Sequence, residues 1–510
     1  MISLALDPER LDREVAQVLE ILRTHLNELS NRAIKPSLQA GDLARGFASV
    51  PPESPRSIAE ILEDFQTKVL PAVTHWQHPR FFAYYPATSS IPAILGELMM
   101  ATLGSVGLQW SANPAATELE CVVMDWLMKL LHAPDDSPFL HVSREGGGLI
   151  QNTAGEALAV IMVAARINLH RRDMGDALLT AEQLEQLYWQ DSSSLVVYMS
   201  DQTHFAGPKA ARVAGMRVHR IPARRLTSGN YGIEAWQVRS AMDVDRARGL
   251  TPCLVLLNHG STNTCGSDDL ASFAGLRQDL WVHVDAAYAG SALLLPEQRQ
   301  RSLTLQEIAS SFNFNGSKWL LCGFDSAFLF VRDRRLLKVV YAAGGDYMAK
   351  AQEEDIYNPE FKDWSIPLGR RFRALRIWMV LSYFGREGLE AYLRHSIAQA
   401  DWLREQIDRS DVFEQVARTD LGLVCFTLKS RDPEATESFL ERLNHLSEHG
   451  KHFLIYPSQI EGRRFLRAAL GGIHTTEADL AILWQACLQA AQEVGVAPGR
   501  APCPYPEEPV

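Results

Sequence analysis

The sequence predicts an α/β fold with a mainly parallel central sheet, followed by a smaller α+β domain. Two patterns predict it. Between about residues 95 and 375, short apolar runs bounded by turn or polar residues alternate with helical segments, as expected for strands buried on both faces of a parallel sheet. Beyond them, two further apolar runs alternate with longer helices, which is typical of an α+β layer. We therefore expect a helical flap over 1–90, a large α/β domain over 91–375 and a C-terminal domain over 376–510.

The first ninety residues predict two helices joined by a proline-rich loop. Apolar residues recur at helical spacing over 11–29 and over 57–69, and the loop between them contains Pro51, Pro52 and Pro55. Two short helices cannot bury their apolar faces on each other alone. The flap therefore either packs against the rest of the chain or takes part in a dimer interface.

The large domain contains the runs that predict its sheet. Buried strands are expected at 195–199, 253–257, 281–284 and 327–331. The stretch 216–221 alternates apolar and basic residues, which predicts a half-exposed strand near an edge. In open α/β sheets, ligands bind at the carboxyl ends of the strands, so the functional residues should follow these runs.

The C-terminal part predicts helices and strands in alternation. Helices are expected at 371–384, 387–409, 436–446 and 477–493, and strands at 421–428 and 464–470.

Composition excludes several classes of protein. The 510 residues carry 61 acidic and 50 basic side chains, a net charge of −11 without a basic run, which argues against a nucleic-acid binder. The most apolar stretch, 157–165, is too short to span a bilayer, and the N-terminus becomes charged too early for a secretory signal. The seven scattered cysteines favour reduced thiols over disulfides or a zinc site. We expect a cytoplasmic enzyme without a bound metal.

A glycine-rich segment precedes one long helical run. Glu145 is followed by three glycines, and the helical run opens with Thr153, Ala154 and Gly155. Backbone N–H groups at such a helix start can bind a phosphate. A plain turn with a helix cap is the alternative interpretation.

Three further segments each place one polar side chain beside an apolar run. Asp285 ends one strand, His204 follows another, and Lys318 lies among apolar and amide residues. Singly they could be a helix cap, an interior histidine and a surface lysine. Together with the glycine-rich segment they match the needs of pyridoxal phosphate: a lysine for the aldehyde, an acid for the ring nitrogen, a phosphate cup and a group against the ring.

These segments belong to a wider set of motifs. The set comprises HPRFFAYYP at 78–86, WSANPA and TELE within 110–120, the EGGG loop, SDQTH, HVDAAYAGSA, SFNFNGSKWLL and IPLGRRFR at 366–373. With them the sequence resembles the group II pyridoxal-phosphate decarboxylases, and among these the aromatic-L-amino-acid decarboxylases, over about residues 60 to 475. The resemblance implies fold type I (the aspartate-aminotransferase-like fold), pyridoxal 5'-phosphate as cofactor, an aromatic L-amino acid as substrate, and a homodimer with active sites at its interface.

The resemblance also implies roles for individual residues. Lys318 would attach the cofactor, Asp285 would pair with its ring nitrogen, and His204 would stack on the ring near the substrate carboxylate. Tyr347, on a glycine-flanked loop, would protonate Cα after carbon dioxide leaves. The implied cofactor-binding residues are Thr153, Ala154, Gly155, His204, Thr262, Asp285, Ala287, Asn315 and Lys318. The implied substrate pocket comprises Tyr84, Tyr85, Pro86, Val106, Leu108 and Gly369, with Val106 and Leu108 coming from the partner subunit.

The sequence departs from the family pattern at some of these positions. Gly316 and Ser317 stand where Pro-His usually precedes the lysine, and Leu108 stands where an aromatic residue is common. Gly369 leaves room in the pocket, which in the family goes with tolerance for indole as well as phenol rings. The alternative is an aromatic acetaldehyde synthase, whose plant-type version has phenylalanine in place of the loop tyrosine, so Tyr347 favours the amine-forming reaction. A glutamate decarboxylase and a non-catalytic protein fit the motifs less well.

Overall fold

The computed structural model describes residues 7–174, 193–342 and 356–496 of the protein, without side chains for 170–174. The chain divides into two compact units. The large unit comprises Ala87–Asp401 and Gln415–Cys425. The small unit comprises Met1–Pro86, Trp402–Glu414 and Phe426–Val510. The division into three domains at residues 90 and 375 stays a prediction.

The described residues of the large unit contain a seven-stranded sheet with the order β1-β9-β8-β7-β6-β2-β3. Its strands are β1 (Gly147–Gln151), β2 (Leu195–Ser200), β3 (Arg217–Ile221), β6 (Thr251–Asn258), β7 (Trp281–Asp285), β8 (Ser311–Asn315) and β9 (Ala327–Val331). The five strands from β3 to β8 pair in parallel, whereas β9 runs antiparallel to both β8 and β1. The predicted mainly parallel sheet is therefore confirmed.

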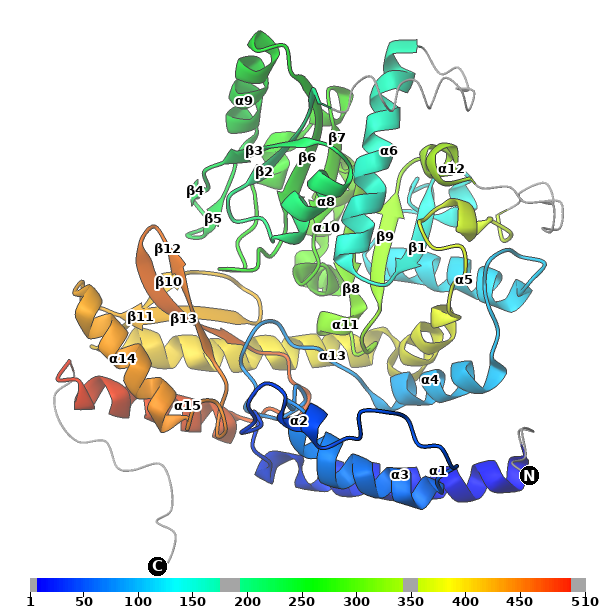
Figure 1. The fold of residues 1–510 in the computed structure, drawn as a ribbon. Coiled ribbons are helices and arrows are strands. Elements are labelled where there is room, and N and C mark those ends of the chain that lie inside the picture. The colour runs from blue at the N-terminus through cyan, green and yellow to red at the C-terminus, as the bar shows by residue number, and fades with distance from the viewer. Residues whose placement is uncertain (1–6, 175–192, 343–355, 497–510) are drawn as a thin grey trace, which may run out of the picture. The chain divides into compact units, whose positions relative to one another are not determined.

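Both faces of this sheet are buried, which explains why its strands are continuous apolar runs. In β6, Leu254 and Leu256 belong to a core cluster that also includes residues of α6 (Ala154–Met174) and α8 (Ala206–Val213). The alternate residues Val255 and Leu257 face the other way and are equally inaccessible to solvent. Figure 1 shows α6 running across the sheet.

The strand predictions are confirmed at the five apolar runs, and the edge position of β3 is confirmed as well. Two strands of this sheet were not predicted. One is β1, which lies inside the segment interpreted as a glycine-rich loop, and the other is β8, which alternates phenylalanine with serine and asparagine.

Helices and a short hairpin connect these strands. The helices are α4 (Ile91–Leu103), α5 (Pro114–Leu130), α6, α8, α9 (Ala235–Ala247), α10 (Arg299–Ile308), α11 (Gly316–Trp319) and α12 (Arg335–Tyr341), and the hairpin is β4 (Arg224–Arg225) with β5 (Tyr231–Gly232). Capping residues in the local sequence define the first turn of several of these helices. In α5, for example, Asn113 accepts a hydrogen bond from the Ala116 N–H and Pro114 occupies the first turn.

The C-terminal elements also match the expected ones closely. The long helix α13 (Arg373–Arg409) bends at Gly385, whose φ of 60° interrupts it where two helices were predicted. The second sheet has the order β10-β11-β13-β12. Its strands are β10 (Phe413–Ala417), β11 (Leu423–Leu428), β12 (Tyr456–Ile460) and β13 (Arg463–Ala469), and helices α14 (Pro433–Leu446) and α15 (Glu477–Glu493) accompany it. Strands β10 and β12 were not predicted.

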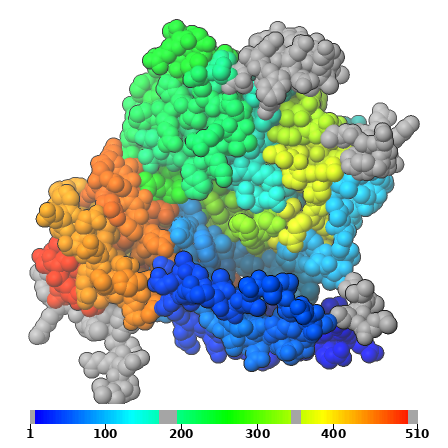
Figure 2. Space-filling view, viewed as in Figure 1, coloured from blue at the N-terminus to red at the C-terminus, as the bar shows by residue number. Residues whose placement is uncertain are grey.

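The predicted N-terminal helices are present in the small unit. They are α1 (Pro8–Glu28) and α3 (Ile58–Asp64), with the short α2 (Asp42–Arg45) between them. In the space-filling view these residues form a continuous blue band (Figure 2). Across the described ranges, no helix has the length and apolar character that a bilayer crossing requires.

Candidate active site

Four of the predicted site residues lie at or just beyond the carboxyl ends of neighbouring parallel strands. Asp285 is the last residue of β7, and Asn315 is the last residue of β8. Lys318 follows three residues later on α11, and His204 lies in the turn between β2 and α8. Because β2, β6, β7 and β8 are parallel neighbours, these ends meet at one edge of the sheet.

The electrostatics of His204 show that three of these groups interact. Burial lowers the pKa of His204, Lys318 lowers it further, and Asp285 opposes both effects. The His204 Nδ1 atom accepts a hydrogen bond of 3.2 Å from the Ala206 N–H. The neutral ring therefore carries its proton on Nε2. The Phe205 ring packs against His204, with the two ring centroids 4.0 Å apart. A planar ligand would stack on the part of the imidazole that Phe205 does not cover.

A chain of buried hydrogen bonds orients Asp285. Its Oδ1 accepts from the Ala287 N–H at 3.0 Å and from Asn313 Nδ2 at 3.2 Å. The Asn313 Oδ1 atom is 2.7 Å from His283 Nε2, and His283 Nδ1 is 2.7 Å from Ser311 Oγ. Burial lowers the pKa of His283 to about 4, so this ring is neutral, donates from Nε2 and accepts from the serine.

This arrangement leaves one oxygen of Asp285 available. Among the described residues, no donor reaches its Oδ2, so that atom can face a cationic N–H. The sequence did not single out Asn313 or His283. The spacing of these residues could have indicated them. His283 and Asp285 are two residues apart and therefore lie on one face of β7, and the same is true of Asn313 and Asn315 on β8.

The start of α6 has the features of a phosphate site. Thr153 Oγ1 accepts from the Glu156 N–H at 3.2 Å. The N–H groups of Ala154 and Gly155 donate to no atom of the described residues. A side chain on Gly155 would place its Cβ 3.9 Å from Ala206 Cβ, so this helix start lies next to the turn that holds His204. Free N–H groups at a helix start attract an anion.

Asn315 adds a second feature that fits an anionic ligand. Its side-chain Oδ1 is buried and has no hydrogen-bond partner within the described ranges. A buried amide without a partner is costly, and a 180° turn of the amide presents Nδ2 to a ligand oxygen instead. The helix start, this amide and the interacting Lys318, His204 and Asp285 together fit pyridoxal phosphate.

The structure explains the glycine that departs from the family pattern before the lysine. A Cβ on Gly316 would lie 2.7 Å from the Phe328 ring, which is closer than real contacts allow. Proline carries a Cβ, so it cannot stand here beside Phe328. The neighbouring Ser317 is buried, and its C=O accepts from the Thr88 N–H at 2.7 Å.

Three predicted substrate-pocket residues lie together in the large unit. Gly107 pairs with Arg370 in an antiparallel bridge, in which the Gly107 N–H donates to the Arg370 C=O at 2.8 Å. This pairing places Val106 beside Gly369, where a Cβ would be 3.5 Å from Val106 Cγ1. Leu108 lines a small pocket behind the same bridge. We call residues 106–108 with 369–370 the wall.

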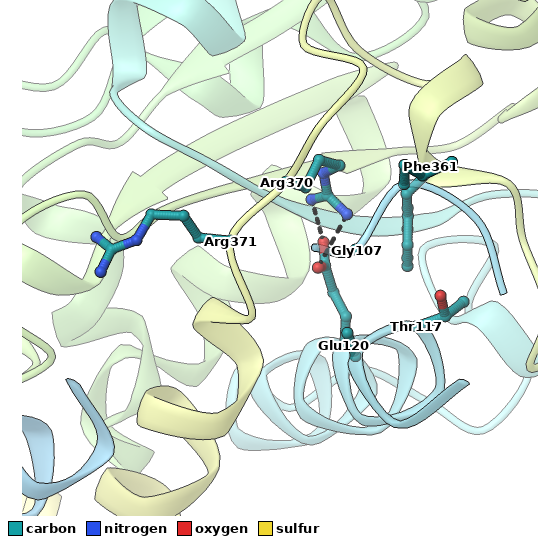
Figure 3. A pocket seen from close by; sticks show the side chains of 8 residues that line it. Gly107, Thr117, Glu120, Phe361, Arg370 and Arg371 are labelled. Atoms are coloured by element: carbon teal, nitrogen blue, oxygen red, sulfur yellow. Dashed lines mark hydrogen bonds and ion pairs between the residues drawn. The ribbon is translucent and has the colours of Figure 1, made fainter. Parts of the chain in front are cut away.

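A buried ion pair supports the wall from behind (Figure 3). The Arg370 guanidinium donates two hydrogen bonds to Glu120 of α5, at 2.6 and 3.0 Å, and also donates to the Ile150 C=O at 2.9 Å. Glu120 Oε1 accepts from the Ile150 N–H at 2.8 Å. The pair thus fixes the wall to β1, the strand that leads into the start of α6.

The remaining predicted residues lie in other segments of the chain. Tyr84, Tyr85 and Pro86 belong to the small unit. There Tyr84 stacks on Trp76 with centroids 5.2 Å apart and has a φ of 56°, and Tyr85 is buried. Thr262 is exposed in the loop after β6. Tyr347 lies outside the described residues.

Comparison with known proteins identifies the family. The model of the pyridoxal-dependent decarboxylase conserved domain matches residues 41–429. The chain is 36% identical to phenylacetaldehyde synthase of Arabidopsis thaliana, over 94% of this chain and 95% of that protein. It is 33% identical to aromatic-L-amino-acid decarboxylase of Rattus norvegicus, over 96% and 99%.

A solved structure agrees with these matches. The tryptophan decarboxylase of Catharanthus roseus, in complex with L-tryptophan, superposes with a TM-score of 0.86 at 30% identity, covering 96% of this chain and 100% of that one. The fold-type-I prediction and the cofactor prediction are therefore confirmed. The chain belongs to the pyridoxal-dependent decarboxylase family and is a carboxy-lyase that uses pyridoxal phosphate.

Proposed function

We propose that the protein converts an aromatic L-amino acid to the corresponding arylalkylamine and carbon dioxide. The observation that carries this proposal is the position of Lys318, His204 and Asp285 at one carboxyl edge of the sheet, where Lys318 and Asp285 both act on the pKa of His204. The rat relative is an aromatic-L-amino-acid decarboxylase, and the Catharanthus roseus structure contains L-tryptophan, which supports an aromatic substrate.

Each residue has a definite task in this proposal. Pyridoxal phosphate, when bound, supplies a conjugated ring that accepts the electron pair of the breaking Cα–carboxylate bond. Lys318 holds the cofactor covalently and exchanges it for the substrate amine. Asp285, through its available Oδ2, keeps a proton on the ring nitrogen, and Asn313 holds that carboxylate in place. His204 lies against the ring and directs Nε2–H at the substrate carboxylate.

The phosphate end and the pocket are assigned on the same basis. The N–H groups of Ala154 and Gly155, with the Asn315 amide and the Thr153 hydroxyl, bind the phosphate. Ala287 would pack against one face of the cofactor ring, and Thr262 would lie near the ring substituents. The wall, with Val106, Leu108 and the spacious Gly369, receives the aromatic ring, together with Tyr84, Tyr85 and Pro86.

Amine or aldehyde formation depends on what happens at Cα after carbon dioxide leaves. We assign Tyr347 the protonation of Cα, which completes amine formation before oxygen can react. A specific observation favours the aldehyde as a second candidate product, because the Arabidopsis relative at 36% identity is a phenylacetaldehyde synthase. The presence of tyrosine rather than phenylalanine at 347 supports the amine.

One assay tests the reaction and the product together. Purified holoenzyme is incubated with L-tryptophan, L-tyrosine, L-phenylalanine or L-DOPA, and carbon dioxide, amine, aldehyde and hydrogen peroxide are measured, with L-glutamate and D-tryptophan as controls. We expect equal amounts of amine and carbon dioxide without peroxide from at least one aromatic L-amino acid, and more peroxide from Tyr347→Phe. Turnover of glutamate with none of the aromatic substrates would refute the proposal.

We also propose a homodimer with active sites at its interface. Helix α1 has a periodic apolar stripe, yet none of its residues is buried. Helix α4 leaves Leu95, Leu98 and Met99 each about half exposed, and Val106 of the wall is 52% exposed. Apolar faces of this extent are characteristic of protein interfaces, and the exposed wall supports a pocket completed by the partner subunit.

A reducing, cytoplasmic location is the remaining proposal. Six cysteines in the described ranges are buried and unbonded to one another. Free buried thiols are typical of proteins from reducing compartments. Fractionation of expressing cells, with activity recovered in the cytosolic fraction, tests it.

A further inference from the structure

A cleft apart from the candidate active site occupies one side of the large unit. It has a volume of about 770 Å³, which is in the range of small-molecule sites. Four segments line it: the β4–β5 hairpin, the loop after β6, the first turn of α10 and residues 418–421. None of Lys318, His204, Asp285 or Thr153 lines it.

The charged residues of the cleft fall into paired and unpaired groups. Arg301 is paired with Asp420 at 2.7 Å, and Arg224 is paired with Glu234. Within each pair, the carboxylate offsets the charge of the guanidinium group. Arg225 of the hairpin and Arg418 form no ion pair with any described residue, and both line the cleft.

Two further carboxylates line the cleft, Asp268 and Asp269, and neither forms an ion pair with Arg225 or Arg418 among the described residues. Asp268 is buried and accepts hydrogen bonds from the N–H groups of Ile233, at 2.9 Å, and Asn258, at 2.6 Å. Burial raises its pKa to about 6. Asp269 is half-buried. The guanidinium groups of Arg225 and Arg418 are therefore the ones in the lining that no described carboxylate holds in an ion pair, and both stay available to a ligand.

Hydroxyl groups line the same cleft as these two arginines, and Arg418 is held in place through its backbone. Arg418 lies on the hairpin turn: its N–H donates to the Gly229 C=O at 3.3 Å, and Asn230 Nδ2 donates to its C=O at 2.8 Å. The hydroxyl-bearing residues Thr227, Ser228, Thr304 and Thr419 also line the cleft. Guanidinium groups with hydroxyl groups around them are suited to phosphate and carboxylate groups.

A buried polar side chain opens onto the same cleft. His259 is only 2% exposed and lines it. Its Nδ1 is 2.8 Å from Ser267 Oγ, and its Nε2 has no partner among the described residues. The His259 N–H donates to the Asp285 C=O at 2.9 Å, so this wall of the cleft is continuous with the strand end that carries the candidate cofactor partner.

We propose that this cleft is a second ligand site, which binds a small molecule through a phosphate or carboxylate group held by Arg225 and Arg418. The Nε2 atom of His259 and the lining hydroxyl groups provide further hydrogen bonds to the ligand. The site is distinct from the phosphate site at the start of α6 because it shares no lining residue with it. The loop after β6, of which Thr262 is part, forms one of its walls through Cys265 and Ser267.

Calorimetry on the holoenzyme tests the site. The cofactor is kept saturating so that the α6 phosphate site is filled, and the probes are pyrophosphate and tricarballylate at low ionic strength. We expect saturable binding of one probe per chain, weakened at least tenfold in an Arg225→Ala/Arg418→Ala variant. Tighter binding of pyrophosphate indicates a phosphorylated ligand, and tighter binding of tricarballylate indicates a carboxylate.

Two controls make the result decisive. Arg248→Ala removes an exposed, unpaired arginine outside the cleft and should leave the affinity unchanged. Hydrogen exchange should slow in 224–231 and 415–421 when the probe binds. Because both arginines are exposed, the double variant should fold and keep its cofactor. The absence of saturable binding, or equal affinity of the double variant and the parent, would overturn the proposal.

Discussion

At the scale of the residue, Gly316 shows how one missing side chain shapes the site. A Cβ at this position would meet the Phe328 ring at 2.7 Å, and overpacking of this kind costs about 1–3 kcal/mol. We therefore expect Gly316→Ala to lower the thermal midpoint of the holoenzyme and to speed cofactor loss, because Lys318 lies two residues away. Phe328→Leu combined with Gly316→Ala should recover most of the loss. Equal cofactor retention in parent and Gly316→Ala would contradict this explanation.

The same residues show what the sequence could and could not reveal. Lys318, Asp285 and His204 were predictable because each follows or joins an apolar run, and strand ends gather ligands. The departure at Gly316 was visible, but its cause was not. Phe328 lies twelve positions away on β9, and only the pairing of β8 with β9 brings the two residues together.

At the scale of the element, the Glu120–Arg370 pair joins α5, β1 and the wall. Both side chains are nearly inaccessible to solvent, at 4% and 8% exposure. Removing one partner of a buried pair costs roughly 3–5 kcal/mol, because the other charge stays buried and unpaired. We expect Glu120→Ala to lose stability on this scale, measured by denaturant unfolding.

Two further variants distinguish the cost of an unpaired buried charge from the role of the pair in positioning the wall. Glu120→Leu with Arg370→Met should restore much of the stability, since a well-packed apolar pair can replace a buried ion pair. It should still raise KM for the aromatic substrate, because the wall loses its hydrogen bonds to Ile150. As a matched control, Glu297→Ala breaks an exposed pair with Arg394 and should cost less than about 1 kcal/mol. A Glu120→Ala variant as stable as the Glu297→Ala control would contradict the account.

The elements that were not predicted share a physical cause. Strand β8 alternates phenylalanine with Ser311, Asn313 and Asn315, and these polar residues do not suggest a buried strand. In the fold, Asn313 is buried because His283 and Asp285 of β7 are its hydrogen-bond partners. Strand β1 begins with two glycines: the first leaves space for the His141 ring, and the second leaves space for Met124 and Phe330. Strand formation there depends on neighbours distant in the sequence, which periodicity alone does not show.

At the scale of the whole molecule, the exposed face of α4 predicts association. We expect Leu98→Glu to shift the protein toward monomer in sedimentation velocity and to lower its activity in proportion, because a charge in an apolar interface is costly. Val244→Glu is the matched control, since Val244 of α9 has the same 46% exposure as Leu98. A fully active monomeric parent enzyme would refute the dimer.

Buried histidines predict how the molecule responds to acid. Burial lowers the pKa of His78, His141, His259 and His283 to about 4 each, whereas in the unfolded chain these residues titrate near 6.5. Between these values the unfolded state binds more protons, so stability rises with pH. The stabilisation is complete above about pH 6.5 and is lost as the pH falls toward about 4.

The magnitude of this acid effect can be measured at one fully buried side chain. His141 alone contributes up to roughly 3 kcal/mol of the acid destabilisation. We expect the apparent Tm of the holoenzyme to fall between about pH 7.5 and about pH 5. The fall should be smaller in His141→Asn, although that variant is less stable at neutral pH. A Tm independent of pH over this range would contradict the assignment of neutral buried histidines.

The central claim is that Lys318 holds the cofactor at the carboxyl edge of the sheet, and covalent trapping tests it most directly. The purified holoenzyme is reduced with borohydride, digested and mapped by mass spectrometry, with Lys318→Ala treated in parallel. We expect one pyridoxyl-phosphate group per chain, on the peptide that contains Lys318, and neither label nor decarboxylation in Lys318→Ala. A label on another lysine, or undiminished activity in Lys318→Ala, would contradict it.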